Sequence, residues 1–195
     1  MRAWIVLVLI GCVACSANSE RARLIDREIT GQVLFESYSI DQTWSYKLSG
    51  MYIAADGTVW AYEQTGTPWY PEKIKPGELY EKDMLTKHRN AHQVGTVDRT
   101  LLRHMADLIK PVARGKVTSA AGSAYGNSSL DVAYLFNPDT SVYSEIILAG
   151  RGDRVATNSA AEAKTSLFQY FNLTSRLVIA ITAQPPSAHR GFYEY

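Results

Sequence analysis

Hydrophobic and polar residues alternate through the first part of the chain in the way that half-buried β-strands require. Trp44, Tyr46, Leu48 and Tyr52 occupy even positions, and polar residues lie between the first three of them. Further along, Asp56-Gly57 separates two apolar, β-prone runs. A turn dipeptide of this kind between such runs predicts a β-hairpin.

A second pair of strands is predicted over residues 130–136 and 141–148, on either side of Asn137-Pro138-Asp139. The segment 119–129 is rich in Gly, Ser and Ala, so we expect a loop there, and Gly150-Arg151-Gly152-Asp153 is typical of a turn. A short apolar strand is predicted at 177–181.

Helical periodicity is clearest over residues 98–114, where apolar residues recur at spacings of three and four and Asp98 is placed to cap the first turn. Pro111 should bend the last turn, and Gly115 should end the helix. A shorter helix is predicted over 79–88. Ser159 and Glu162 form a capping-box pattern ahead of a third helix.

Residues 65–77 contain three prolines and must form a loop. Strand pairs with helices between them predict an α+β fold: a single domain, with an antiparallel sheet and two to three packed helices. We assign this globular domain to residues 29–183 and a mobile tail to 184–195.

The first residues have the pattern of a secretory signal. Arg2 supplies a positive charge, and residues 3–10 form an apolar run that is too short to span a bilayer core of about 30 Å. Polar residues begin at Ser16. An ordinary secretion signal with incidental cysteines is one interpretation of this pattern.

Leu9-Ile10-Gly11-Cys12 resembles the bacterial lipobox, in which a branched aliphatic residue, a small or aliphatic residue and Gly or Ala precede a cysteine. This resemblance to bacterial lipoproteins implies that residues 1–11 are a removed signal peptide and that the Cys12 thiol carries lipid. Residues 12–28 would then be a lipidated tether.

Cys15, which follows Val13-Ala14, is the second candidate for lipid attachment. In the lipoprotein family the residue after the acylated cysteine helps to sort the product. Here that residue is Val13 or Ser16, in place of the Asp that accompanies retention in the inner membrane. The resemblance therefore implies an outer-membrane anchor facing the periplasm.

Composition narrows the function classes further. The chain has 195 residues, 46% apolar and 20% charged, which fits neither wholesale disorder nor a polytopic membrane protein. Lys and Arg number 20 against 19 acidic residues, so no global charge attracts nucleic acid, and we expect no nucleic-acid partner. Both cysteines precede Ser16, so the globular part has no disulfide or thiol chemistry.

Motifs that carry chemistry are few. The sequence has no Gly-x-Ser-x-Gly nucleophile elbow, and no Ser lies three residues before a Lys. His88 and His92 are one helical turn apart, but the Glu of a metalloprotease helix does not follow the first of them, and two surface histidines are the simpler interpretation. We therefore predict no catalytic residue, no metal and no cofactor.

Aromatic residues are the positive feature, because nine of the 21 lie between positions 38 and 80. Many should pack in the core, but Trp60 and Tyr62 alternate with smaller residues, so one face of their strand can project outward. Trp69-Tyr70 lies in the proline-rich loop and has little reason to be buried. Tyr and Trp are enriched in interface hot spots. The predicted partner-binding residues are Trp60, Tyr62, Trp69, Tyr70, Arg151 and Asp153.

These features predict a lipoprotein of the cell envelope that acts by binding a protein. The layout is similar to that of small immunity-type lipoproteins, which implies an immunity or inhibitor protein whose partner is a toxic, secreted periplasmic hydrolase. One alternative is an enzyme that acts on peptidoglycan or polysaccharide through a carboxylate pair beside an aromatic platform. Another is an envelope assembly lipoprotein. A groove with convergent carboxylates would favour the enzyme, and a protruding aromatic ridge would favour the inhibitor.

Overall fold

The structure is a computed structural model that describes residues 32–72, 75–122, 126–166 and 170. Cys12, Cys15, the expected tether, the strand predicted at 177–181 and the tail all lie outside these residues. Within the described part, no helix is long and apolar enough to cross a membrane.

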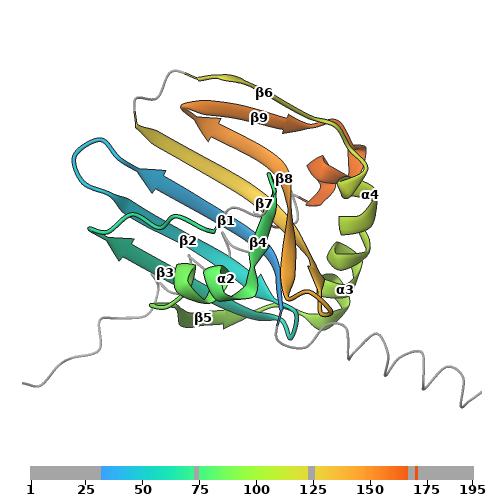
Figure 1. Cartoon of the computed structure of the whole chain (residues 1–195). Helices are drawn as coiled ribbons and strands as arrows, with labels where there is room; N and C mark the ends of the chain where they lie inside the picture. The colour runs from blue at the N-terminus through green and yellow to red at the C-terminus, as the bar shows by residue number, and fades with distance from the viewer. Residues whose placement is uncertain (1–31, 73–74, 123–125, 167–169, 171–195) are drawn as a thin grey trace, which may run out of the picture.

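One antiparallel sheet of nine strands dominates the fold, as Figure 1 shows. The predicted antiparallel sheet with a few helices is confirmed, although the sheet is larger than the sequence indicated. Eight strands follow the order β5-β3-β2-β1-β7-β8-β9-β6, and β4 pairs with β8 beside this path. The strands are β1 (Val33–Asp41), β2 (Lys47–Ala54), β3 (Thr58–Thr65), β4 (Glu78–Tyr80), β5 (His92–Thr96), β6 (Val117–Ala121), β7 (Asn127–Asn137), β8 (Val142–Gly152) and β9 (Arg154–Asn158).

The hairpin predicted at Asp56-Gly57 joins β2 to β3. Gly57 has a φ of +90°, a conformation that glycine adopts without steric cost. The Asp56 carboxylate accepts a hydrogen bond from the Thr58 N–H at 2.8 Å, which closes the turn. The local signal therefore identified both the turn and the strands beside it.

Three helices are named in the structure: α2 (Glu81–Lys87), α3 (Arg99–Asp107) and α4 (Ile109–Ala113). Asp98 caps α3 as predicted, since its carboxylate accepts hydrogen bonds from the N–H groups of the second and third residues after it. The long helix predicted over 98–114 is divided at Leu108. Pro111 has no N–H to donate to the carbonyl of Asp107, so the helical ladder is interrupted just where α3 ends.

The helix predicted after residue 159 is present as helical residues 161–166. Its start differs from the predicted capping box, because the Ser159 N–H donates to the Lys116 carbonyl at 3.0 Å. The Asn158 side-chain oxygen accepts from the Ala160 N–H at 2.9 Å. The Ser159 hydroxyl accepts from the Lys116 N–H at 2.9 Å, which ties the start of β6 to this segment.

The prediction of a loop over 119–129 is wrong for most of that range. β6 runs to Ala121 and pairs with β9, and β7 begins at Asn127 opposite Asp41 of β1. All five residues of β6 are exposed, so no hydrophobic alternation marks the strand. Similarly, β8 continues to Gly152, and only Gly152-Asp153 forms the turn that leads into the unpredicted β9.

The two faces of the sheet have different cores. On one face α3 and α4 cover an apolar cluster that includes Phe35, Ile53, Met105 and Val112. On the other face, in front in Figure 1, β4 and α2 cover a cluster rich in tyrosine. We call these the α3–α4 face and the α2 face.

Candidate functional site

Two regions of the molecule are candidates for a functional site. One is a cluster of charged groups under α2, and the other is an end of the sheet where turns meet. We call the first the buried polar network. It consists of Glu36, Tyr38, Tyr62, Lys87, His88, Tyr134 and Glu145.

Glu36 is the centre of the buried polar network. Its side chain is fully buried and forms an ion pair with the Lys87 ammonium at 2.9 Å. The hydroxyls of Tyr62 and Tyr134 both donate to its carboxylate, the latter at 2.6 Å. Burial alone would raise the pKa of Glu36. Lys87, His88 and the Tyr134 hydroxyl together outweigh that effect and hold the pKa well below its usual range.

Lys87 is the last residue of α2, and its side chain is also fully buried. Its ammonium lies 3.5 Å from the ring centroid of Tyr38 and 5.0 Å from that of Trp69, so two aromatic rings supplement the ion pair. The side-chain amide of Gln64 donates to the Lys87 carbonyl. These contacts fasten the end of α2 to the sheet.

Gly50 provides the space that the buried polar network needs. It lies opposite Tyr38 of β1 and Tyr62 of β3. A Cβ atom at position 50 would stand 2.8 Å from the Tyr62 hydroxyl and 2.7 Å from the Ser37 carbonyl oxygen. The missing side chain therefore lets the Tyr62 hydroxyl reach across β2 to Glu36.

Glu145 brings a second carboxylate to the same place. The Tyr134 hydroxyl, which donates to Glu36, also lies 3.3 Å from Glu145 Oε2, and the Tyr38 hydroxyl lies 3.5 Å from it. Burial, and then the negative charge of Glu36, raise the pKa of Glu145, although Lys87 partly opposes this. One carboxyl group of the pair is thus held ionised while protonation of the other is favoured.

The buried polar network reaches toward the surface through His88. The His88 Nε2 atom lies 2.9 Å from Glu36, and its ring stacks on Tyr52 with the centroids 4.2 Å apart. Tyr52 in turn stacks on Trp60. His88 and His92 have different surroundings, because His88 contacts Glu36 and His92 is an exposed residue of β5. Among the described residues no group of three metal-ligating side chains converges.

The second place is formed where several turns meet at one end of the sheet. We call residues 42–46, 66–70 and 151–153 the loop end. Backbone hydrogen bonds connect it: the Gly66 N–H donates to the Tyr46 carbonyl at 3.0 Å, and the Gln42 N–H donates to the Gly126 carbonyl at 2.7 Å. The Asp153 N–H donates to the Asn127 carbonyl at 2.9 Å.

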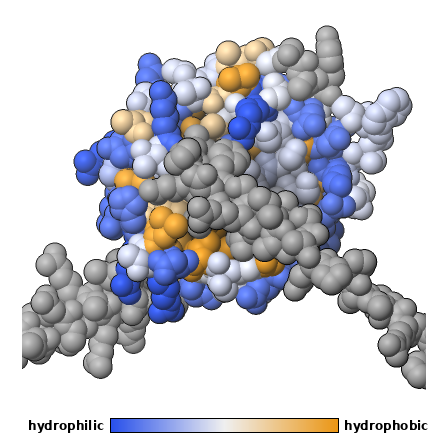
Figure 2. Space-filling view, turned by 180° about the vertical axis from the view of Figure 1, so that it is seen from behind, coloured by the Kyte–Doolittle hydropathy of each residue, from blue (hydrophilic) through white to orange (hydrophobic). Residues whose placement is uncertain are grey.

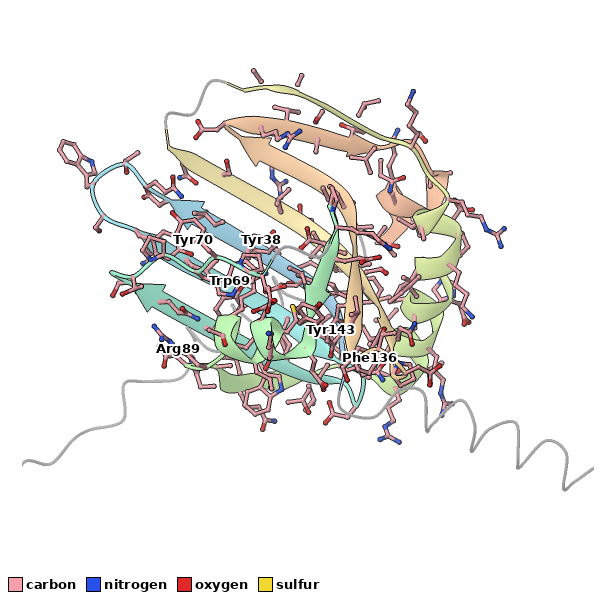
Figure 3. The ribbon with its side chains drawn as sticks, in the orientation of Figure 1. Tyr38, Trp69, Tyr70, Arg89, Phe136 and Tyr143 are labelled. Carbon is pink, nitrogen blue, oxygen red and sulfur yellow. The ribbon has the colours of Figure 1, made fainter. Side chains whose placement is uncertain are left out.

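Trp44 and Tyr70 are the two most exposed large hydrophobic residues in the described part of the chain, at 98% and 77% of full exposure. Trp44 lies in the turn between β1 and β2, and Tyr70 lies on the loop after β3, where Figure 3 places it near Trp69 over the α2 face of the sheet. The prediction that Trp44 lies in an alternating strand is wrong. The Asp41 carboxylate accepts from the Thr43 N–H and hydroxyl, and this turn places Trp44 between β1 and β2.

The structure separates the predicted partner-binding residues. Tyr62 is buried because its hydroxyl bonds Glu36, so its prediction as a surface residue is wrong. Trp69 is half-buried, since the loop folds back over α2 and the indole N–H donates to the Asp83 carbonyl at 3.2 Å (Figure 3). Trp60 is half-buried beside Tyr52, away from the loop end.

Tyr70, Arg151 and Asp153 are exposed, and their role in partner binding stays a prediction. The Arg151 side chain is 57% exposed and pairs with the buried carboxylate of Asp131 at 2.7 Å. Sequence reasoning missed Trp44 as a surface residue and Glu36 and Lys87 as a buried pair. The Asp-x-Thr turn before Trp44 was a usable signal, whereas nothing local marks two charges 51 positions apart.

Comparison with known proteins gives this chain no relatives: no protein-family model, no curated protein and no solved structure matches it. The functional argument therefore depends on the two places described above.

Proposed function

We propose that this protein is an envelope lipoprotein, anchored through Cys12 or Cys15 to the outer membrane on the periplasmic side, that acts by binding a protein partner. Its binding surface is the loop end. The observation that carries this proposal is the exposure of two large aromatic side chains, Trp44 and Tyr70, on segments that leave the same end of the sheet.

Exposed aromatic residues of this size favour contact with a partner. Trp and Tyr are the residues most enriched in binding hot spots, and each covers a large area with few rotatable bonds. The turn that carries Trp44 is held by the Asp41–Thr43 hydrogen bonds and by its connection to Gly66. A surface that is already ordered loses little entropy on binding, which favours high affinity.

In its most specific form, the proposal is an immunity or inhibitor protein that neutralises a toxic periplasmic hydrolase. Protruding aromatic side chains suit this role because an inhibitor works by filling a concave active site of its target. Arg151 and Asp153 supply charges of both signs at the same end of the sheet, which suits the polar rim of an interface.

The alternative, an enzyme acting on peptidoglycan or polysaccharide, has one observation in its favour. Glu36 and Glu145 converge on the Tyr134 hydroxyl, and paired carboxylates are the equipment of glycoside hydrolysis. However, the side chains of Glu36 and Lys87 have no exposed surface, so a substrate has no access to Glu36 unless α2 moves. The binding function is therefore the better supported of the two.

Lipid attachment is tested by replacing cysteines in the full chain. With Cys12→Ala and Cys15→Ala together, we expect labelled palmitate to be lost and the protein to leave the membrane fraction. Each single variant identifies the acylated residue. Membrane retention and labelling that persist in the double variant would contradict the proposed anchor.

Partner binding is tested with the full, membrane-extracted protein. A protein captured from the envelope is purified, and its dissociation constant is measured against the wild type and against Trp44→Ala/Tyr70→Ala. We expect at least a tenfold loss of affinity for the double variant and loss of inhibition of the partner's hydrolase activity.

The matched control is Leu85→Ala, which removes another exposed apolar side chain, 68% exposed on α2. Its affinity should equal that of the wild type. Equal losses in the control and the loop-end variant, or none in either, would contradict the assignment of the surface. A captured partner that the protein binds without inhibiting would contradict the immunity role alone.

A further inference from the structure

The outer surface of α3 and α4 carries a stripe of basic side chains. Arg99, Arg103, Lys110 and Arg114 follow one another at spacings of four, seven and four, which places them on one side of the helical segment. Lys116 follows directly after α4, and all five residues are exposed. The buried residues Leu102, Met105, Ile109 and Val112 face the core. We call the five cations the basic stripe.

The basic stripe is a local excess of positive charge on a chain whose basic and acidic residues are nearly equal in number. Basic and acidic residues number 20 and 19 in the whole sequence. Between positions 98 and 116 the sequence has five Lys and Arg residues and two acidic residues, Asp98 and Asp107, and the Asp98 carboxylate is engaged in capping α3. In Figure 2 the margin that carries α3 and α4 includes strongly hydrophilic residues.

The cations of the stripe also differ from other basic residues in their partners. Elsewhere, Lys47, Lys75, Lys82 and Lys87 each pair with a glutamate. Within the described residues, Arg99, Lys110, Arg114 and Lys116 form no ion pair. Four unneutralised cations along one ridge form a surface that favours a polyanionic partner.

The path of the chain places this stripe beside the end of the sheet at which β1 begins. The Gln32 carbonyl accepts from the Ala55 N–H at 2.7 Å, so the chain enters next to the β2–β3 turn. The Val97 N–H donates to the Gly57 carbonyl of the same turn, and α3 starts two residues later. Trp44 lies beyond the far end of β1.

We propose that the basic stripe binds the anionic headgroups of membrane phospholipids. Each Lys or Arg close to an anionic membrane surface strengthens binding roughly fivefold, within a Debye length of about 10 Å at ordinary salt. Anionic lipid is favoured over other polyanions because the chain leading to the proposed lipid anchor enters the fold beside the stripe. Only this choice of polyanion rests on the proposed function. With the stripe on the membrane, the loop end faces away from the lipid.

The test uses the full chain with Cys12→Ser and Cys15→Ser, so that no acyl chain contributes to binding. Partition is measured onto vesicles of phosphatidylcholine alone and of phosphatidylcholine mixed with phosphatidylglycerol, at low and high salt. The ratio of the two partition coefficients isolates the electrostatic contribution, because the apolar N-terminal segment is common to both measurements.

The stripe variant is R99Q/K110Q/R114Q/K116Q. The control, K75Q/K82Q/R89Q/R154Q, removes the same number of charges from exposed residues elsewhere. We expect the wild type to prefer anionic vesicles and this preference to fall with salt. The preference should drop at least tenfold in the stripe variant and change by less than about threefold in the control. Circular dichroism verifies that all variants fold.

Three results would overturn the proposal: no wild-type preference for anionic vesicles, equal losses in both variants, or binding by the stripe to DNA or heparin without binding to vesicles. Neither acylation nor the protein partner enters this assay. Failure here therefore leaves the proposed function standing, and failure of the proposed function leaves this result interpretable.

Discussion

The buried polar network and the loop end use similar side chains in opposite ways. In the network, tyrosine hydroxyls, a lysine and two glutamates satisfy one another under α2, and the side chains of Glu36 and Lys87 are removed from solvent. At the loop end, Trp44 and Tyr70 make little contact with the rest of the protein. The ionisable side chains are thus buried, whereas the aromatic side chains that are suited to contact a partner are exposed.

From this difference we propose that the network stabilises the fold and that the loop end binds the partner. Substitutions in the network should change stability strongly, and substitutions at the loop end should change binding while leaving stability intact. The following predictions test that division, from the largest expected change in stability to the smallest.

Removing the buried cation should have the largest effect. Lys87→Met removes the ammonium partner of the buried Glu36, which should lower the free energy of unfolding by about 3–5 kcal/mol in chemical denaturation. The control is Lys82→Met in the same helix, whose ion pair with Glu72 is exposed, and it should leave stability close to that of the wild type. Glu36→Gln combined with Lys87→Met should recover most of the loss. Equal costs for the two lysines would contradict a structural role for the pair.

Two buried tyrosines provide a finer comparison. Tyr134→Phe removes a hydroxyl that donates to Glu36 and should cost about 1.5–3 kcal/mol, the range for hydrogen bonds to charged groups. Within the described residues the buried hydroxyl of Tyr46 has no hydrogen-bond partner, so Tyr46→Phe should be neutral or slightly stabilising. A larger cost for Tyr46→Phe than for Tyr134→Phe would mean that the network is not the source of stability.

The raised pKa of Glu145 should make stability depend on pH. The folded state keeps its proton to higher pH than the unfolded state, whose carboxyl has a pKa of about 4.3. Stability should therefore decline as pH rises from about 4.3 through the raised pKa, and Glu145→Gln should flatten that decline. Denaturation of both proteins across this range provides the measurement. Parallel pH profiles would show that Glu145 does not titrate differently on folding.

Trp44→Ala should have the smallest effect on stability, within about 0.5 kcal/mol, because the side chain is 98% exposed. A cost above 1 kcal/mol would show that the indole packs against the protein and is not reserved for a partner. Thermal or chemical denaturation of this variant separates stability from binding before any partner is known.

Local signals predicted the local parts of the fold. The Asp56-Gly57 hairpin and the Asp98 cap each depend on a few consecutive residues, and both are present. The strands β6 and β9 were missed. The five residues of the edge strand β6 are all exposed and show no amphipathic pattern, and β9 has only five residues, of which two are buried. Their pairing is decided by the neighbouring strands, which a single segment does not reveal.

The candidate binding residues divide in the same way. Tyr70, Arg151 and Asp153 were predicted correctly as exposed because a proline-rich loop and a glycine-containing turn mark their surroundings. The orientation of Tyr62 was not predictable, because it depends on Gly50 and on Glu36 in a different strand. Trp69 is drawn inward by Lys87 and Asp83, which belong to a helix later in the chain.

The most direct test of the central claim is site-specific photocrosslinking of the full-length protein in cells. A photoreactive amino acid is placed at position 44 or, as a control, at Val117, which is 40% exposed at the opposite end of the molecule. The account predicts a discrete crosslinked protein adduct from position 44 and none from position 117. Adducts of equal yield from both positions, or an adduct from 117 alone, would contradict it.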